Sequence, residues 1–279
     1  MIRILVDSSA DFTTEELKEI NLMVVPLQVT IQGQGYYDGV NLFRDEFYEM
    51  LTSSKDFPKT SQPSPQDFVD KFEEAKENGD TVLCILLSSS LSGTYQSALL
   101  AKNIVEYDNI YLVDSLSATV GTRILVDTAK KMIAEDKTIE EIVNYLEELK
   151  KHIKIYAAVD TLEYLCKGGR VSKTVATIGE MANIKPLITV DLEGKVDVMG
   201  KRPGVIRALS FLMKKLEESE VNTDYPMYSL FSYGTNNCDK LEEKLKKANY
   251  QTKERLQIGP TIGTHIGPEA FGICFVEKF

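Results

Sequence analysis

An apolar run passes directly into a serine-rich loop in the segment Val82-Leu83-Cys84-Ile85-Leu86-Leu87-Ser88-Ser89-Ser90-Leu91-Ser92-Gly93-Thr94-Tyr95. The apolar run predicts a strand that is buried on both faces, and residues 94–107 predict the helix that follows it. Open α/β sheets bind ligands at the loops that follow their strands. The segment therefore predicts an α/β fold with a candidate binding loop between strand and helix.

The same alternation of apolar runs and amphipathic stretches continues on both sides of this segment. Further strands are predicted at residues 2–6, 23–31 and 110–113, and further helices at 44–52, 65–78, 121–135 and 139–150. Strands that alternate with helices in this way are typical of a parallel sheet.

The pattern changes after His152. Strands are predicted at residues 154–159, 227–232, 252–257 and 272–277, a hairpin at 183–190 and 195–199, and helices at 205–217 and 239–248. We place a domain boundary near Ile155. The prediction is an α/β protein with two domains: residues 1–155 form a three-layer parallel-sheet domain, and residues 156–279 form an α/β domain with a mixed sheet.

The chain is acidic. It has 32 Lys and Arg against 42 Asp and Glu, which gives a net charge of −10. Such a field repels phosphate backbones and anionic lipid surfaces, so nucleic acid and peripheral membrane binding are disfavoured. An anion site would have to be local, at a helix start or a cluster of donors.

The cysteines and the N-terminus favour a cytoplasmic protein. Four cysteines are scattered without a Cys-x-x-Cys pair, as expected of reduced thiols. The apolar run between Met1 and Asp7 is too short for a signal peptide, because an acidic residue already ends it at position 7. No apolar window approaches the roughly 18 residues of a membrane helix, so stable membrane insertion is not expected.

Several cofactor sites are disfavoured by the residues. Only His152 and His265 are present, far apart, so we expect no metal site. The run Gly33-Gln34-Gly35-Tyr36-Tyr37-Asp38-Gly39 misses the dinucleotide fingerprint by one residue. The run from Lys167 to Thr174 has Ser172 where a phosphate loop needs glycine. We expect no nucleotide and no other cofactor.

The loop from Ser88 to Tyr95 is the strongest candidate site. It offers hydroxyls, backbone N–H groups and a helix start to one anion, whereas a simple helix cap would explain only Ser92 or Thr94. A nucleophile elbow would need glycine in place of Ser90, which disfavours a serine hydrolase.

Two other segments carry polar residues without an evident local role. In Thr60-Ser61-Gln62-Pro63-Ser64-Pro65, Ser64 and Pro65 start a helix, which leaves Thr60 and Ser61 unexplained. His265 lies in what we expect to be an irregular, glycine-rich loop, residues 259–268. A structural hydrogen bond and a binding role are equally compatible with a lone histidine there.

Together, these segments resemble the DegV family of bacterial fatty-acid-binding proteins. The resemblance covers essentially the whole chain and rests on motifs that occur in order: Val6-Asp7-Ser8-Ser9-Ala10-Asp11, Thr60-Ser61-Gln62-Pro63, Leu91-Ser92-Gly93-Thr94-Tyr95-Gln96-Ser97-Ala98, Val113-Asp114-Ser115, Lys167-Gly168-Gly169-Arg170, Asn183-Ile184-Lys185-Pro186 and Gly263-Thr264-His265-Ile266-Gly267-Pro268.

The resemblance implies a two-domain protein without enzymatic activity of its own. It would hold one long-chain fatty acid, such as palmitate, and present the carboxylate to a separate ATP-dependent fatty acid kinase subunit, whose acyl phosphate product serves phospholipid synthesis. By motif, the carboxylate would be bound by Thr60, Ser92, Ser61, Gly93, Thr94 and His265. Arg170, and Arg202 in Lys201-Arg202-Pro203, would contact the kinase or its phosphate.

Glu269 departs from the family pattern. It stands where the resemblance implies a second glycine after Gly267-Pro268. If it points inward, its charge would oppose a bound carboxylate; if outward, it would pair with His265 or alter the docking surface. Two rival functions also stay open at this stage: a serine acyl hydrolase that uses Ser92 and His265, and a carrier of another lipid anion without a kinase partner.

Overall fold

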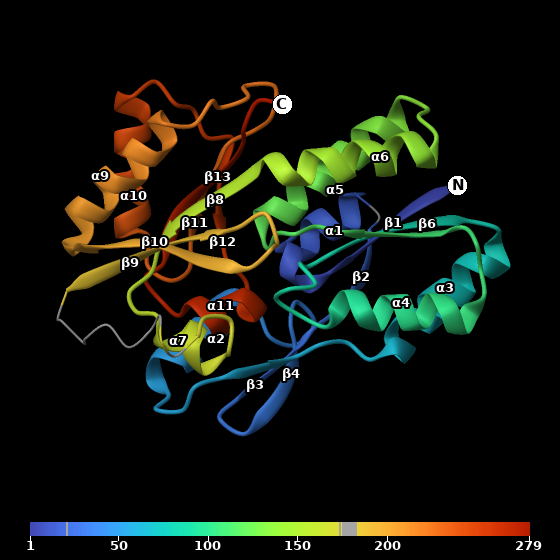
Figure 1. Cartoon of the computed structure of the whole chain (residues 1–279). Coiled ribbons are helices and arrows are strands. Elements are labelled where there is room, and N and C mark those ends of the chain that lie inside the picture. The colour runs from blue at the N-terminus through green and yellow to red at the C-terminus, as the bar shows by residue number, and fades with distance from the viewer. Residues whose placement is uncertain (21, 173, 175–182) are drawn as a thin grey trace.

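A computed structural model describes residues 1–20, 22–172, 174 and 183–279. The described chain forms three β-sheets with helices around them (Figure 1). The strands of the four-stranded sheet all precede residue 115, and those of the six-stranded sheet all follow residue 152. The predicted mixed architecture is therefore confirmed, while the boundary near Ile155 stays a prediction.

The four-stranded sheet is parallel, with the strand order β2-β1-β6-β7. Its strands are β1 (Ile2–Asp7), β2 (Met23–Val25), β6 (Thr81–Leu86) and β7 (Ile110–Asp114). Val82, Cys84 and Leu86 pack under α3 (Pro65–Asn78) and α4 (Thr94–Val105). Leu83 and Ile85 point to the other face, under α5 (Val120–Ala134) and α6 (Ile139–Leu149). Burial on both faces explains why this strand is an unbroken apolar run.

The six-stranded sheet is mixed, with the order β10-β9-β8-β13-β11-β12. All neighbours are antiparallel except β11 and β12. Its strands are β8 (Ile153–Ala158), β9 (Ile184–Val190), β10 (Val196–Pro203), β11 (Tyr228–Phe231), β12 (Glu254–Gln257) and β13 (Phe271–Val276). One face is covered by α9 (Gly204–Glu217) and α10 (Asn236–Lys247).

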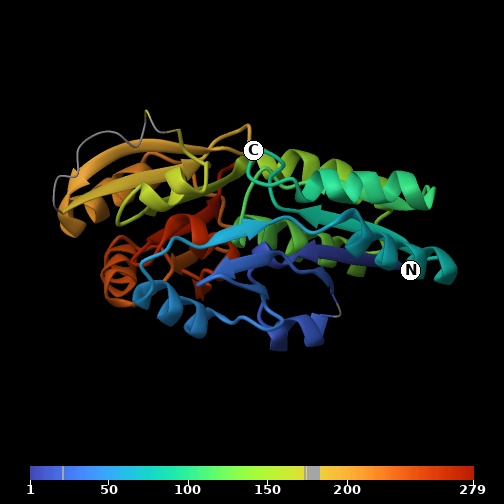
Figure 2. The ribbon, with the colours of Figure 1, turned by 90° about the horizontal axis from the view of Figure 1, so that it is seen from below.

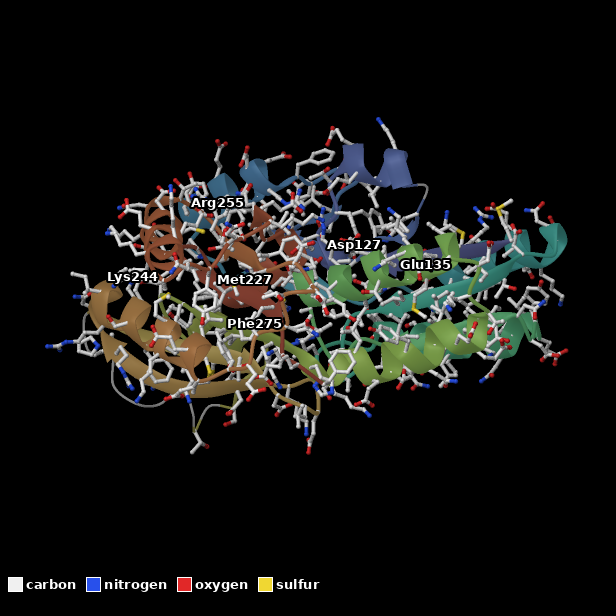
Figure 3. The ribbon with its side chains drawn as sticks, turned by 90° about the horizontal axis from the view of Figure 1, so that it is seen from above. Asp127, Glu135, Met227, Lys244, Arg255 and Phe275 are labelled. Atoms are coloured by element: carbon white, nitrogen blue, oxygen red, sulfur yellow. The ribbon has the colours of Figure 1, made fainter. Side chains whose placement is uncertain are left out.

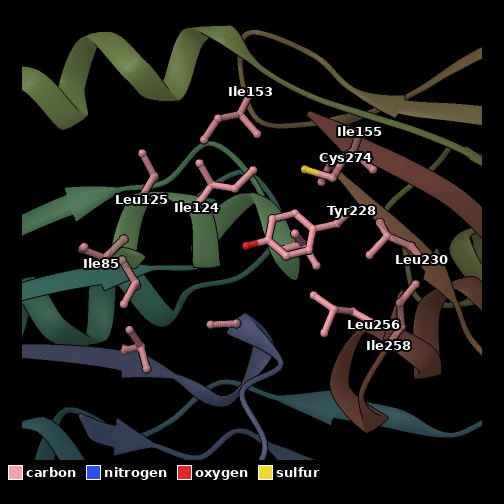
Figure 4. Close-up of a cluster of buried hydrophobic side chains, with 14 of the residues drawn as sticks. Ile85, Ile124, Leu125, Ile153, Ile155, Tyr228, Leu230, Leu256, Ile258 and Cys274 are labelled. Carbon is pink, nitrogen blue, oxygen red and sulfur yellow. The ribbon is translucent and has the colours of Figure 1, made fainter. Parts of the chain in front are cut away.

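The other face of the six-stranded sheet shares its core with the N-terminal half. Figure 4 shows Ile124 of α5 beside Tyr228 and Cys274 of this sheet, and all three belong to one buried apolar cluster. In the view from above, Asp127 lies on α5 and Glu135 directly follows that helix, while Met227 and Phe275 lie in the neighbouring C-terminal half (Figure 3). The two large sheets are therefore joined by continuous apolar packing.

The third sheet was not predicted. It has the order β4-β3-β5 and contains β3 (Gln28–Ile31), β4 (Gln34–Tyr37) and β5 (Lys59–Ser61). The single strand expected at 23–31 is wrong, because the chain leaves the parallel sheet after Val25 and enters this sheet at Gln28. Pro26 has no N–H for a ladder, and the N–H of Leu27 donates instead to Ser8 Oγ at 3.0 Å.

The expected irregular loop at 259–268 is also wrong, because most of it forms the short helix α11 (Pro260–Ile266). Pro260 occupies the first turn, where its missing N–H costs nothing, and Gly267 ends the helix at φ 72°. α11 packs against α7 (Glu163–Lys167) and α2 (Arg44–Ser53) (Figures 1 and 2). The remaining short elements are η1 (Ser8–Ala10), α1 (Thr14–Ile20) and η2 (Lys150–His152).

Across the described ranges, no helix combines the length and the apolar character needed to traverse a bilayer. Within the same ranges, no group of three or more His, Cys, Asp or Glu side chains is arranged to hold a metal ion.

Candidate functional site

A pocket lies where the parallel sheet meets the six-stranded sheet. The space between its atoms is about 830 Å³, including the open solvent at its mouth. The loops after β2, β6 and β7 form one side, and β8, β9 and β11 form the other. Most of the lining is aliphatic. The polar residues among the lining are Thr60, Ser92, Thr119, Arg170, Thr189, Thr261 and His265.

The loop between β6 and α4 brings Ser92 to the pocket. The Ser92 N–H donates to the carbonyl of Ser88 at 3.1 Å, which closes the turn. The hydroxyls of Ser92 and Thr94 are 2.8 Å apart, and the Thr94 N–H donates to Ser92 Oγ at 3.3 Å. Ser92 is thus held directly before the N-cap of α4, Gly93, next to the first turn, whose free backbone N–H groups favour an anion.

Thr60 and His265 form the second polar part of the pocket. Thr60 lies on β5, opposite Val29 of β3, and its Oγ1 is 2.8 Å from Nε2 of His265 on α11. Burial, followed by the nearby Arg170 charge, lowers the pKa of His265 to about 4. The imidazole is therefore neutral near pH 7 and can offer either a donor or an acceptor.

Arg170 supplies positive charge at the same end. Its Nε donates to the carbonyl of Leu91 at 2.9 Å, and its Nη1 donates to the carbonyl of Gly168. Burial lowers the pKa of Arg170, but a guanidinium stays protonated in proteins. Among the described residues that line the pocket, Arg170 is the one with a fixed charge. Its contact with Leu91 ties the Gly168-Gly169-Arg170 turn to the Ser92 loop.

Gly168 allows this turn to lie on the histidine ring. A Cβ at position 168 would be 2.2 Å from Nδ1 of His265, so any side chain there would displace the ring or the turn. Nδ1 itself has no hydrogen-bond partner within the described part of the chain. The ring is therefore held by packing on one side and by Thr60 on the other.

Of the predicted carboxylate ligands, Thr60, Ser92 and His265 line the pocket and three do not. Ser61 is exposed. Gly93 begins α4 and packs against Gln62, whose Oε1 would lie 1.9 Å from a Cβ at position 93. Thr94 is fully buried behind Ser92. Gly93 and Thr94 thus support the Ser92 turn.

The two predicted partner-contact arginines lie in different places. Arg170 lines the pocket, whereas Arg202 lies on β10 outside the lining. The Arg202 guanidinium stacks over the Phe211 ring at 4.3 Å, and its Nη1 donates to the carbonyl of Lys201.

Glu269 points outward. Its side chain is exposed and accepts a hydrogen bond from Asn237 Nδ2 at 3.3 Å. It therefore does not oppose an anion in the pocket. It adopts φ 66°, the left-handed conformation that glycine takes without strain.

Two of the loop serines have a structural role that the sequence did not reveal. Ser88 Oγ donates to the carbonyl of Gly194 at 2.8 Å, and Ser90 Oγ donates to the carbonyl of Glu193 at 2.7 Å. Glu193 and Gly194 belong to the turn between β9 and β10. Gly194 allows the close approach, because a Cβ there would be 2.2 Å from Ser88 Oγ. The turn thus fastens the six-stranded sheet to the Ser88 loop.

The geometry does not support a serine hydrolase. The Ser92 hydroxyl pairs with Thr94, and His265 Nε2 pairs with Thr60. In the segments the structure covers, no carboxylate bonds Nδ1 to orient the ring. The nucleophile–base–acid chain of such enzymes is therefore not formed here.

Comparison with known proteins gives a consistent assignment. Residues 1–278 match a family model described as "Uncharacterised protein, DegV family". A DegV domain-containing protein of Caldanaerobacter subterraneus is 35% identical over 285 residues, with 99% of each chain covered.

Solved structures show the same fold. A DegV family protein from Thermus thermophilus, described by its fatty acid binding, has a TM-score of 0.89 and 30% identity, with 99% of each chain covered. A stearic acid-binding protein from Eubacterium ventriosum has a TM-score of 0.88 and 28% identity over 100% of this chain and 99% of its own.

Proposed function

The chain belongs to the DegV family, and from this premise we propose that it binds one long-chain fatty acid in the pocket between its two large sheets. The observation that carries the proposal is an aliphatic pocket whose hydroxyl, imidazole and guanidinium groups come together from distant segments. Fatty acid binding by similar DegV proteins supports it.

Apolar burial would supply most of the affinity. At about 0.8 kcal/mol per methylene, a sixteen-carbon acid gives roughly 12 kcal/mol before association costs are subtracted. The chain of the acid would run along the aliphatic walls, and its carboxylate would lie near Thr60, Ser92 and His265. Ser61, Gly93 and Thr94 would act through the loops that hold these side chains.

The polar end of the pocket can bind a carboxylate even though the whole chain is acidic. Neutral hydroxyls and a neutral imidazole can donate to a carboxylate, and Arg170 provides a local positive charge. The apolar contacts and these few donors can together overcome the net charge of −10.

We further propose that the bound acid is presented in the cytoplasm to a separate fatty acid kinase subunit. There a carboxylate oxygen would attack the γ-phosphorus of ATP, the bond to the leaving ADP oxygen would break, and the acyl phosphate would enter phospholipid synthesis. Arg170 and Arg202 would contact the kinase or its phosphate. The family resemblance supports this role, and the position of Arg170 beside the pocket is consistent with it.

Denaturing mass spectrometry of the purified protein tests the binding proposal. We expect a stoichiometric long-chain acid to be released. A ligand-free protein that also fails to bind labelled palmitate would contradict the proposal. Addition of a kinase subunit and ATP should yield acyl phosphate; stable acid binding without this product would favour a carrier without a kinase partner.

A further inference from the structure

Two buried carboxyl groups hold the start of α11. Asp38, which follows β4, is 5% exposed, and its Oδ2 accepts hydrogen bonds from Thr261 Oγ1 at 2.5 Å and from the Thr261 N–H at 3.2 Å. Asp11, which follows η1, is 3% exposed, and its Oδ1 accepts from the Gly259 N–H at 3.0 Å. A Cβ on Gly259 would lie 2.4 Å from Asp11 Oδ1 and 3.8 Å from Asp38 Oδ1, so both groups flank one glycine.

Two residues of α2 hold the residues just before α11. Arg44 donates from Nε to the carbonyl of Gln257 at 2.9 Å and from Nη2 to the carbonyl of Asp11 at 2.7 Å. The Tyr48 hydroxyl donates to the carbonyl of Ile258 at 2.9 Å. We call Asp11, Asp38, Arg44 and Tyr48 the α11 clasp. All four come from the N-terminal segment, whereas the backbone they hold lies more than 200 residues later.

The clasp determines the position of one wall of the pocket. α11 contributes Thr261, Ile262, His265 and Ile266 to the lining. Its middle packs tightly on the clasp, because a Cβ at Gly263 would lie 2.6 Å from the Tyr48 hydroxyl oxygen. A shift at the start of α11 would therefore move His265 relative to Thr60.

The charges around Asp38 are poorly balanced. Burial and, to a lesser extent, the Asp11 charge raise the pKa of Asp38 to about 7, although its hydrogen bonds from Thr261 lower it. Burial raises the pKa of Asp11 to about 6. The Arg44 charge lowers the pKa of both Asp38 and Asp11, and the Arg123 charge lowers the pKa of Asp11.

The other groups nearby do not relieve this imbalance. Asp7 lines a second pocket together with Asp11, Asp38 and Arg44, and burial raises the pKa of Asp7 too. Burial and the two acids raise the pKa of Tyr48, so its hydroxyl stays protonated. Asp11 Oδ2 has no hydrogen-bond partner among the described residues. Ionisation of both Asp11 and Asp38 would thus leave two buried negative charges facing chiefly one arginine, Arg44.

We propose that the protonation state of Asp38 sets how firmly the clasp holds α11, and through α11 the position of His265 in the pocket. Asp38 is then a positioning residue, and it makes ligand retention sensitive to pH near neutrality. The hydrogen bonds from Thr261 favour the ionised form of Asp38, so the loosening has another source. Ionised Asp38 adds a second buried charge that repels Asp11 across Gly259, and this repulsion loosens the start of α11, whereas protonated Asp38 avoids it. This inference rests on the proposed fatty acid binding, because it concerns the regulation of that site.

NMR of the His265 ring tests the clasp without any ligand. The chain has two histidines, so His152→Gln assigns the ring signals. In the wild type, we expect a step in the His265 shifts with a midpoint near pH 7, distinct from its own titration near pH 4. Asp38→Asn should abolish the step near pH 7, whereas the exposed, charge-matched Asp45→Asn should retain it.

No step in the wild type, or an unchanged step in Asp38→Asn, would overturn the inference. Thr261→Val is a second variant. It removes the hydroxyl that bonds Asp38 but keeps Asp38 itself, so the step in the His265 shifts near pH 7 should become smaller.

Binding of labelled palmitate to delipidated protein provides the functional readout. Wild type and Asp45→Asn should bind at least about fivefold more weakly at about pH 8.5 than at about pH 6, and Asp38→Asn should bind equally at both. Binding that is independent of pH in the wild type would refute the regulation alone. No binding at either pH would contradict the proposed function, while the ring titration would still decide the inference.

Discussion

Thr60 Oγ1 and His265 Nε2 are 2.8 Å apart although 205 residues separate them in the chain. One residue comes from the small three-stranded sheet and the other from α11, which the N-terminal clasp holds in place. The polar end of the pocket therefore exists only when the first and last parts of the chain are packed together. This dependence makes the site sensitive to substitutions that never contact a ligand.

Thr60→Val and Ser92→Ala should each weaken retention of palmitate. A hydrogen bond to a charged group contributes about 1.5–3 kcal/mol, so each variant should lose roughly tenfold to a hundredfold in affinity. Equilibrium binding of labelled palmitate to delipidated protein measures the loss. Ser61→Ala is the matched control, since Ser61 is exposed next to Thr60 and should bind like the wild type. Unchanged affinity in the double variant would remove both residues from the site.

Gly168→Ala should displace the His265 ring. The added methyl would lie 2.2 Å from Nδ1, so either the ring or the Gly168 turn must move, and palmitate affinity should fall by at least about fivefold. Gly169→Ala serves as the control: it strains a residue at φ 76° but meets no atom within 4 Å. Both variants should unfold at lower temperature. Only Gly168→Ala should lose affinity, and equal affinities would argue against the packing role.

The buried His265 should reduce stability at acidic pH. Its pKa is about 4 in the folded protein and 6.5 in an unfolded chain, so its favourable contribution is complete above pH 6.5 and is lost as the pH falls toward 4. The loss amounts to about 3 kcal/mol at most. Urea unfolding at several pH values should show a shallower decline in the free energy of unfolding for His265→Gln than for the wild type. Identical declines for wild type and His265→Gln would contradict the buried, neutral imidazole.

Glu269→Gly should stabilise the protein and leave palmitate affinity unchanged. A non-glycine residue in the left-handed conformation costs about 1 kcal/mol, and Glu269 adopts φ 66°. For a chain of this size, about 1 kcal/mol corresponds to a rise of roughly 2–4 °C in the unfolding midpoint. Glu269→Ala, which removes the charge but keeps the strained backbone, should show no such rise. Stronger palmitate binding by Glu269→Gly would show that Glu269 acts on the pocket after all.

The regular elements could be predicted because local sequence determines them. The strand at 82–87 and the helices around it follow from apolar periodicity and caps, such as Ser64 with Asp67 at the start of α3. The expected single strand at 23–31 failed because both of its halves are extended and apolar. Only tertiary pairing assigns Met23–Val25 to one sheet and Gln28–Ile31 to another.

The site was predictable only in part. Ser92 stands between a strand and a helix, a place that local sequence identifies, whereas Thr60 and His265 were assigned through the family resemblance. Ser88 and Ser90 looked like further anion donors, but they bond the β9–β10 turn. Asp11 and Asp38 gave no sequence signal as a pair, because isolated acids in loops are usually solvated. Only the folded chain shows that both are buried against α11.

The walls of the pocket are also part of the protein's main apolar cluster: Ile155, Ile188, Leu230 and Ile258 belong to both. A bound acyl chain would complete the hydrophobic core itself. Binding and folding are then linked equilibria, and a ligand at a hundredfold excess over its dissociation constant would add about 2.7 kcal/mol of stability. Ligand-free molecules would be less stable, would unfold more often and would be degraded first. The cellular amount of this protein would therefore follow the supply of lipid, even with its synthesis held constant.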